Sequence, residues 1–138
     1  MNIVIIDAQG GGIGKQLTAA VKRILPDAEI TAVGTNTAAT TAMIKAGADH
    51  AATGENAVIV ASRKADVISG PIGIVIADSL YGEITPAMAA AVAQSSAVRV
   101  LIPYSHCDNF IIGSGDHGIG EYVSMAAEKI MDIVKSSA

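Results

Sequence analysis

The sequence predicts a three-layer, Rossmann-like α/β domain with a mostly parallel sheet, spanning residues 1–138. Three observations favour this fold class. Short apolar runs alternate with amphipathic stretches along the chain, as in a parallel sheet that is covered by helices on both faces. The first run, Ile3–Ile6, is apolar on both faces, which is typical of a central parallel strand. A glycine-rich turn then leads directly from this run into an amphipathic stretch.

The first helix is expected from Ile13 to Leu25, because apolar residues recur there at helical spacing and Pro26 then ends it. A second strand follows at Glu29–Val33. The polar residues after this strand cap a short helix over Ala38–Ala46, and Gly47 ends that helix.

The next part of the chain allows two interpretations. Asp49–Ala52 is expected to be a short third strand, and Thr53 then caps a helix that ends at Lys64. By local propensity, Val58–Val60 could instead be a strand. We favour the helix, because Asp66–Ser69 already offers the next strand and parallel neighbours need a crossover between them.

Two helices are expected in the following segment. Pro71–Tyr81 has proline at the first helical position and Gly82 just past its end. Its β-branched residues leave a buried strand at Gly73–Ala77 as the alternative. The pair Thr85-Pro86 repeats the signal of a cap followed by proline, and it opens an alanine-rich helix that extends to Ser95.

The last elements are two strands and one helix. Val98–Ile102 is a mostly apolar strand that Pro103 closes. Phe110–Ile112 is expected to be a short strand at the edge of the sheet, and its short connection would force it to run antiparallel to its predecessor. The helix Ile119–Lys135 has the clearest helical periodicity in the chain.

The loop after the first strand is the strongest functional signal in the sequence. It reads Asp7-Ala8-Gln9-Gly10-Gly11-Gly12-Ile13-Gly14. Its glycines allow a ligand to approach the backbone closely, and the first amides of the following helix have no partner within the helix. Because parallel strands end at one rim of the sheet, other loops converge on the same place. The candidate binding residues are Asp7, Gln9, Gly10, Gly11, Gly12, Ile13, Gly14, Gly34, Thr35, Asn36, Gly70 and Pro71.

The expected ligand is a small anion, a nucleotide or a dinucleotide such as NAD or NADP, although known phosphate loops match only in part. The dinucleotide fingerprint fails at Lys15, where its third glycine belongs, and no carboxylate ends the second strand. Gly12-Ile13-Gly14 resembles the loop of short-chain dehydrogenases, but no tyrosine is followed by a lysine four residues later. Gly14-Lys15 resembles the end of a P-loop, but Gln16 replaces the hydroxyl that binds Mg²⁺.

The loop and the Gly34-Thr35-Asn36 turn occur together with two longer motifs, Gly70-Pro71-Ile72-Gly73-Ile74-Val75-Ile76-Ala77 and Gly82-Glu83-Ile84-Thr85-Pro86. With these motifs the chain resembles a family of short bacterial proteins known only as a domain of unknown function. The resemblance extends to about Cys107. It implies a Rossmann-like fold and a nucleotide site, and it brings no established activity, substrate or catalytic residue.

The candidates for catalysis are Asp7, His106 and Cys107, but they form no recognised signature. Adjacent side chains on an extended segment point to opposite faces, so His106 and Cys107 are poorly placed for a direct pair. His106, Asp108, Asp116 and His117 have metal-ligand chemistry, yet their spacing fits no zinc pattern, and we expect no metal. A ligand-binding or regulatory module is therefore favoured. The alternatives are a small oxidoreductase or transferase that uses the Tyr104–Asp108 loop, and a purely structural domain.

Composition restricts the partners and the location. The net charge of −4 and the absence of lysine or arginine blocks argue against nucleic acid and anionic membranes. Residues are 51% hydrophobic but only 3% aromatic, and this apolar excess favours a homo-oligomer, with a homodimer as the simplest case. Cys107 is the only cysteine, and no stretch resembles a signal peptide or a membrane span, so we expect a cytoplasmic protein.

Overall fold

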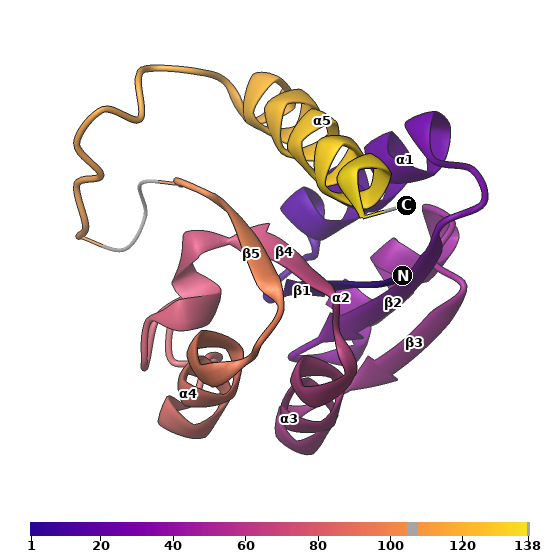
Figure 1. Ribbon diagram of the computed structural model, residues 1–138. Helices are drawn as coiled ribbons and strands as arrows, with labels where there is room; N and C mark the ends of the chain where they lie inside the picture. The colour runs from indigo at the N-terminus through magenta and orange to yellow at the C-terminus, as the bar shows by residue number, and fades with distance from the viewer. Residues whose placement is uncertain (105–107, 138) are drawn as a thin grey trace.

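The computed structural model describes residues 1–104 and 108–137, and its centre is a five-stranded parallel sheet (Figure 1). The strands are β1 (Asn2–Asp7), β2 (Glu29–Gly34), β3 (His50–Thr53), β4 (Val67–Pro71) and β5 (Val98–Ile102). Their order across the sheet is β3-β2-β1-β4-β5, and every neighbouring pair is parallel. The chain moves outward from β1 to β3 and then returns past β1 to β4. This order matches the first five strands of dinucleotide-binding folds, whose ligands lie where the winding direction reverses.

Helices cover both faces of this sheet and complete three layers (Figure 1). One face carries α1 (Gly12–Ile24) and α5 (Ile119–Ser136), with α2 (Thr37–Lys45) beside α1. The other face carries α3 (Glu55–Lys64) and α4 (Pro86–Gln94). Within the described parts of the chain, no helix has the length and apolar character needed to cross a membrane.

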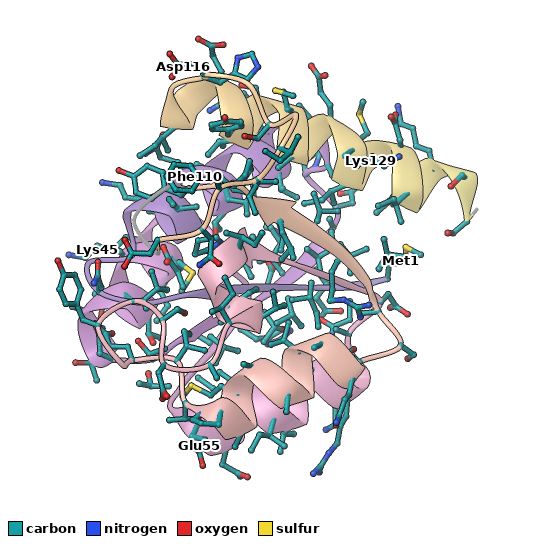
Figure 2. The ribbon with its side chains drawn as sticks, turned by 90° about the vertical axis from the view of Figure 1, so that its left-hand side faces the viewer. Met1, Lys45, Glu55, Phe110, Asp116 and Lys129 are labelled. Carbon is teal, nitrogen blue, oxygen red and sulfur yellow. The ribbon has the colours of Figure 1, made fainter. Side chains whose placement is uncertain are left out.

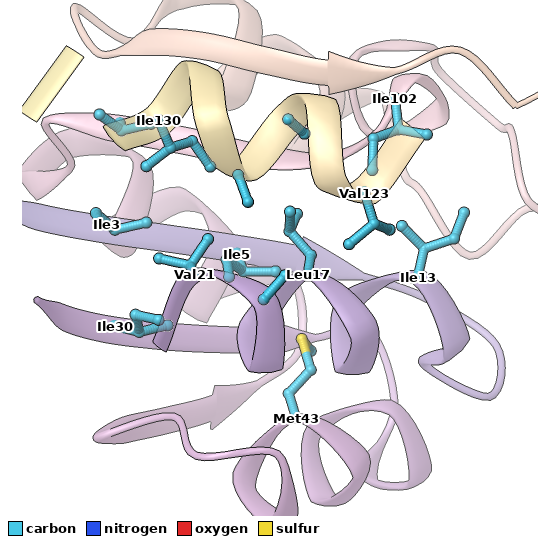
Figure 3. Packing of buried hydrophobic residues seen from close by; sticks show 14 of the residues in the cluster. Ile3, Ile5, Ile13, Leu17, Val21, Ile30, Met43, Ile102, Val123 and Ile130 are labelled. Carbon is cyan, nitrogen blue, oxygen red and sulfur yellow. The ribbon is translucent and has the colours of Figure 1, made fainter. Parts of the chain in front are cut away.

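The core follows from the alternation of side chains along β1. Ile3 and Ile5 pack into the cluster beneath α1 and α5, which is drawn in Figure 3. Val4 and Ile6 pack on the opposite side, against α3 and α4. Because all four side chains are fully buried, β1 is held from both faces and gives the loop that follows Asp7 a rigid base.

The expected helix over Pro71–Tyr81 is wrong, and so is its alternative as a strand. Pro71 instead ends β4 with extended backbone (φ −65°, ψ 149°), and only a single 3₁₀ turn, η1 (Ile72–Val75), follows. Beyond it, residues 76–82 form a series of turns, which we call the 76–82 turn. A helix cannot continue through this segment because Asp78, Leu80 and Tyr81 have left-handed backbone conformations.

The expected antiparallel strand at Phe110–Ile112 is also wrong, since all strands of the described chain are parallel and these residues form none. They belong to an irregular excursion over residues 108–118, which we call the arm and which extends away from the sheet (Figure 1). Gly113 and Gly115 have φ values of 84° and 78° and turn the arm back towards α5. The segment therefore has the propensity of a strand but does not lie along β5.

The other elements agree with expectation within a few residues. The helical interpretation of Val58–Val60 is correct, because these residues lie inside α3. The residue before α3 is Gly54, however, whereas Thr53 is the last residue of β3. The hydroxyl of Thr53 lies 2.7 Å from that of Thr40 on α2 and is therefore engaged elsewhere.

Candidate functional site

The glycine-rich loop leaves the carboxyl end of β1 and enters α1 within a few residues. Gly11 is the residue before the helix, with φ 74°, and α1 begins at Gly12. The amide of Gly11 donates to the Ala8 carbonyl oxygen (3.0 Å), which closes a tight turn. This geometry directs the first amides of α1 towards the switch point between β1 and β4.

Two glycines of this loop are required by the fold itself. A Cβ on Gly11 would lie 2.8 Å from the Ala39 Cα, and its left-handed backbone also disfavours any side chain. A Cβ on Gly14 would lie 2.6 Å from the Met43 sulfur. These positions allow α1 to pack closely against α2, so their glycines have a structural explanation.

The other two glycines, Gly10 and Gly12, have no such explanation. A Cβ added to either would meet no atom within 4 Å, and neither residue has a left-handed backbone. Between residues that the structure describes, neither amide donates a hydrogen bond. Both residues line a cleft, so their lack of side chains leaves two amides accessible from it.

The cleft has a volume of about 700 Å³ and lies at the β1/β4 switch point. This volume is within the range of small-molecule sites, roughly 300–1,000 Å³. One wall is the glycine-rich loop and the other is the 76–82 turn. Further lining residues are Gln16, Pro71, Tyr104, Asp108 and Ile119.

The 76–82 turn is strained but well bonded. Asp78, Leu80 and Tyr81 have φ values of 63°, 54° and 58°. Backbone in such sparsely populated regions costs about 1–3 kcal/mol per residue. The Asp78 amide donates to the Ile84 carbonyl oxygen (2.7 Å), and the Ser79 hydroxyl donates to the Gly73 carbonyl oxygen. The turn therefore holds its shape despite the strain and presents Tyr81 at the edge of the cleft.

Glu83 joins this turn to two other loops. Its Oε1 accepts hydrogen bonds from the Gln9 amide (2.9 Å), the Thr35 hydroxyl (2.6 Å) and the Asn36 side-chain amide (2.8 Å). Asn36 Nδ2 also donates to the Gln9 carbonyl oxygen (2.9 Å), and Asn36 Oδ1 caps α2. We call this network the Glu83 bridge. It ties the ends of β1 and β2 together.

The bridge favours the charged form of Glu83. Burial raises the pKa of the Glu83 carboxyl, but the hydrogen bonds from Thr35, Gln9 and Asn36 more than offset burial and hold the pKa below its usual value. The bridge is therefore built on a carboxylate, which makes its hydrogen bonds stronger than those between neutral groups.

Asp7 lies beneath the glycine-rich loop and is 5% exposed. Its Oδ1 accepts the Ala8 amide (2.8 Å) and its Oδ2 accepts the Gly14 amide (2.7 Å). Burial raises the pKa of Asp7 above its ordinary value, and the amides of Gly14 and Ala8 offset this only in part. Asp7 thus satisfies the inner amides of the loop and leaves those of Gly10 and Gly12 to the cleft.

Comparison with known proteins identifies the family. A family model described as a domain of unknown function, DUF3842, matches residues 2–135. The chain belongs to the DUF3842 family. The match confirms the resemblance inferred from the sequence and extends it beyond Cys107 to residue 135, in the last turn of α5. Among proteins with curated descriptions, none matches this DUF3842 chain significantly.

A solved structure shows that the fold occurs elsewhere. The DUF3842 chain is similar to a dodecameric FMN-dependent UbiX-like decarboxylase from Escherichia coli O157:H7, with 17% sequence identity and a TM-score of 0.52. The similarity covers 98% of this chain and 95% of the other. At this identity the comparison establishes a shared α/β fold with a parallel sheet.

The structure separates the binding candidates of the DUF3842 chain into two groups. The first group lines the cleft and comprises Asp7, Gln9, Gly10, Gly11, Gly12, Ile13 and Pro71. The second group lies outside the lining and comprises Gly14, Gly34, Thr35, Asn36 and Gly70. Within the second group, Thr35 and Asn36 belong to the Glu83 bridge. Gly70 allows close packing of β4 on β1, since its Cβ would collide with the Ile6 carbonyl oxygen.

The other sequence candidates lie elsewhere or are not described. His106 and Cys107 fall outside the described residues, as does Ser105. His117 lies at the end of the arm, where its Nδ1 is 2.9 Å from Glu121 Oε2. Neither the 76–82 turn nor the bridging role of Glu83 was predicted from the sequence. The only signal for Glu83 was its place in the Gly82-Glu83-Ile84-Thr85-Pro86 motif.

Proposed function

We propose that this DUF3842 protein is a binding module for a nucleotide with a single phosphate group, which the amides of Gly10 and Gly12 bind. The observation that carries the proposal is the difference between the glycines of the loop. Packing explains Gly11 and Gly14, whereas Gly10 and Gly12 face open space in the cleft. A ligand that approaches the backbone closely would explain why these two positions also have no side chain.

The chemistry of the loop supports an anion as the ligand. The first amides of a helix carry partial positive charge and bind phosphate groups. In this chain the Asp7 carboxylate already accepts the amides of Ala8 and Gly14. A phosphate would therefore bind the remaining amides, those of Gly10 and Gly12. The Asp7 side chain is buried beneath the backbone of the loop.

A mononucleotide fits the site better than NAD or NADP. Dinucleotide-binding folds use a carboxylate at the end of the second strand to hold ribose hydroxyls. Here Glu83 reaches that position, but its Oε1 accepts three hydrogen bonds from the protein itself. Among the described residues that line the cleft, neither Glu83 nor any residue of the turn after β2 is present.

FMN is the first ligand to test, because it has one phosphate and because a protein of similar fold is described as FMN-dependent. A bound flavin would supply electron-transfer or electron-sink chemistry, while the chain's own residues would bind and orient it. Asp7, the catalytic candidate in the described part of the chain, has both carboxylate oxygens engaged by amides. This arrangement favours a role for Asp7 in holding the loop rather than in catalysis. We therefore propose a binding module and not an enzyme.

The test uses thermal unfolding with FMN, NAD and ribose 5-phosphate. Saturation at about a hundredfold excess over Kd stabilises a protein by roughly 2.7 kcal/mol. We expect FMN and ribose 5-phosphate to raise the Tm of the wild type. Gly12→Ala should fold normally and lose the shift, because its methyl group would occupy the open space at the amides.

Gly120→Ala is the matched control for this variant. Gly120 also lies at the start of a helix, where a Cβ would meet nothing within 4 Å, but it is not part of the cleft lining. This control should keep the full ligand response. A wild type that responds to neither FMN nor ribose 5-phosphate, or that responds to NAD alone, would refute the proposal, as would a Gly12→Ala variant that responds as strongly as the wild type.

We also propose that the chain assembles with itself through the arm. Phe110 and Ile112 are 93% and 95% exposed, and the arm faces the viewer in Figure 2. Exposed apolar side chains grouped in this way are typical of contact surfaces, and the protein of similar fold is described as dodecameric. Sedimentation of the wild type and of the Phe110→Ser, Ile112→Ser double variant tests this. The wild type should be oligomeric and the variant smaller, whereas equal masses would contradict it.

A further inference from the structure

We infer that Tyr81 is the residue on which the planar ring system of the bound nucleotide stacks, so that the 76–82 turn selects flavin-like ligands over simple sugar phosphates. This inference rests on the proposed phosphate position at Gly10 and Gly12. It goes further by assigning the other end of the ligand and the residue that recognises it.

The first observation is the unusual state of Tyr81. Tyr81 lines the cleft. It is 96% exposed, and its backbone is left-handed. Neither feature stabilises the free protein, because an aromatic ring gains nothing from facing water and a tyrosine rarely takes this backbone. Strain of this kind is typically retained where a residue serves a ligand.

The second observation is that the turn is fixed relative to the phosphate loop. The Gly82 amide donates to the Ser79 carbonyl oxygen (3.1 Å), and the Glu83 amide donates to the Leu80 carbonyl oxygen (3.2 Å). The Glu83 side chain then accepts the amide of Gln9, which precedes Gly10. Tyr81 is therefore only two residues from Glu83, whose side chain is bonded to the glycine-rich loop. This bond fixes the distance between the two walls of the cleft.

The third observation is the chemistry of the wall. Near Tyr81 the cleft is lined by Ile76, Ala77 and Leu80 together with Asp78 and Ser79, and none of the described lining residues is a lysine or an arginine. A phosphate held at the opposite wall would leave the rest of the ligand to face these side chains. An uncharged, planar ring suits such a surface, because aromatic rings stack on tyrosine with additional gain beyond area burial.

The experiment compares FMN with ribose 5-phosphate, which has the phosphate but no planar ring. FMN binding is followed by flavin fluorescence and ribose 5-phosphate binding by calorimetry. We expect Tyr81→Ala to weaken FMN binding by about three- to tenfold and to raise the fluorescence of the bound flavin, since a stacked ring is lost. Its affinity for ribose 5-phosphate should not change. Tyr81→Phe should keep the FMN affinity.

The outcomes distinguish this inference from the proposal on which it rests. If the wild type binds both ligands with equal affinity, or if Tyr81→Ala binds FMN as tightly as the wild type, the stacking role is refuted while the phosphate site stands. If Tyr81→Ala changes only the oligomeric mass, the ring is a subunit contact and the inference is overturned. If the wild type binds neither ligand, both proposals fail.

Discussion

The Glu83 carboxylate accepts the backbone amide of Gln9 at 2.9 Å, although the two residues lie 74 positions apart in the chain. This hydrogen bond joins the glycine-rich loop to the segment after η1. The same oxygen accepts Thr35 and Asn36, so one carboxylate sets the relative positions of three loops. The cleft depends on this arrangement, because its two walls are the first and the last of these loops.

Glu83→Gln tests the charge of the bridge through its pH dependence. The pKa of Glu83 lies below its ordinary value of 4.5 in the folded protein, so its contribution to stability is present above that value and is lost as the pH falls through the lowered pKa. At pH 7 we expect the variant to be less stable by about 1 kcal/mol, since hydrogen bonds to a charged acceptor are stronger.

Urea unfolding of both proteins at neutral and acidic pH measures this effect. The difference in unfolding free energy should shrink as the pH falls through the lowered pKa of Glu83, because the wild-type carboxyl then takes up a proton and becomes as uncharged as glutamine. A difference that stays the same at both pH values would show that the charge of Glu83 does not stabilise the fold.

Gly14→Ala and Gly12→Ala should have opposite effects on the free protein. The Gly14 methyl group would collide with the Met43 sulfur and the Asp7 Cβ, which costs about 1–3 kcal/mol by overpacking. The Gly12 methyl group would meet nothing, and alanine favours a helix over glycine by up to about 1 kcal/mol. Thermal melts without ligand measure both effects. Equal melting temperatures would show that the two glycines are not distinct.

Tyr81→Gly should stabilise the protein by up to about 1 kcal/mol, because glycine adopts a left-handed backbone without the steric cost of a Cβ. The φ of Tyr81 is 58°, so Tyr81→Ala keeps the strain and serves as the control. Chemical unfolding of the two variants measures the difference. A Tyr81→Gly variant no more stable than Tyr81→Ala would mean that the turn is not strained at this residue.

Asp7 should make anion binding sensitive to pH. Burial raises the pKa of Asp7 above its ordinary value of 3.8, so the negative charge beneath the loop develops only as the pH rises through that higher pKa. Affinity for FMN should fall over this range in the wild type, because the carboxylate repels the phosphate. The FMN affinity of the Asp7→Asn variant should not fall as the pH rises through the pKa of Asp7. The phosphate of FMN titrates in the same way with both proteins, so its effect cancels when their Kd values are compared. Parallel pH profiles of the two Kd values would refute the effect.

The sequence predicted the elements whose signals are local. A short run that is apolar on both faces explains why β1 was found, and helical periodicity explains α1 and α5. The error at Pro71 has a physical reason, since the fixed φ of proline, −65° at this residue, suits both the first turn of a helix and extended backbone. Phe110–Ile112 has the composition of a strand, but whether it pairs with β5 depends on the path of the arm.

The part of the candidate site that lies in one continuous segment was predicted from the sequence, and the part that comes from distant segments was not. The glycine-rich loop was recognised because its residues are consecutive and their chemistry is local. The carboxylate at the end of β2 was sought within the second strand and its turn, whereas it comes from Glu83, 47 residues after Asn36. The packing role of Gly11 and Gly14 could not be predicted from the sequence either. Both residues contact α2, and this contact is known only from the structure.

The division among the glycines also has an evolutionary consequence. A descendant of this chain that no longer needed its guest could acquire side chains at positions 10 and 12 without harm, but not at positions 11 and 14, where the helix contact would suffer. Selection for folding and selection for recognition would thus leave different marks within one short loop. Family members that have side chains at positions 10 and 12, but keep glycine at positions 11 and 14, would have the same fold without the ability to bind the ligand.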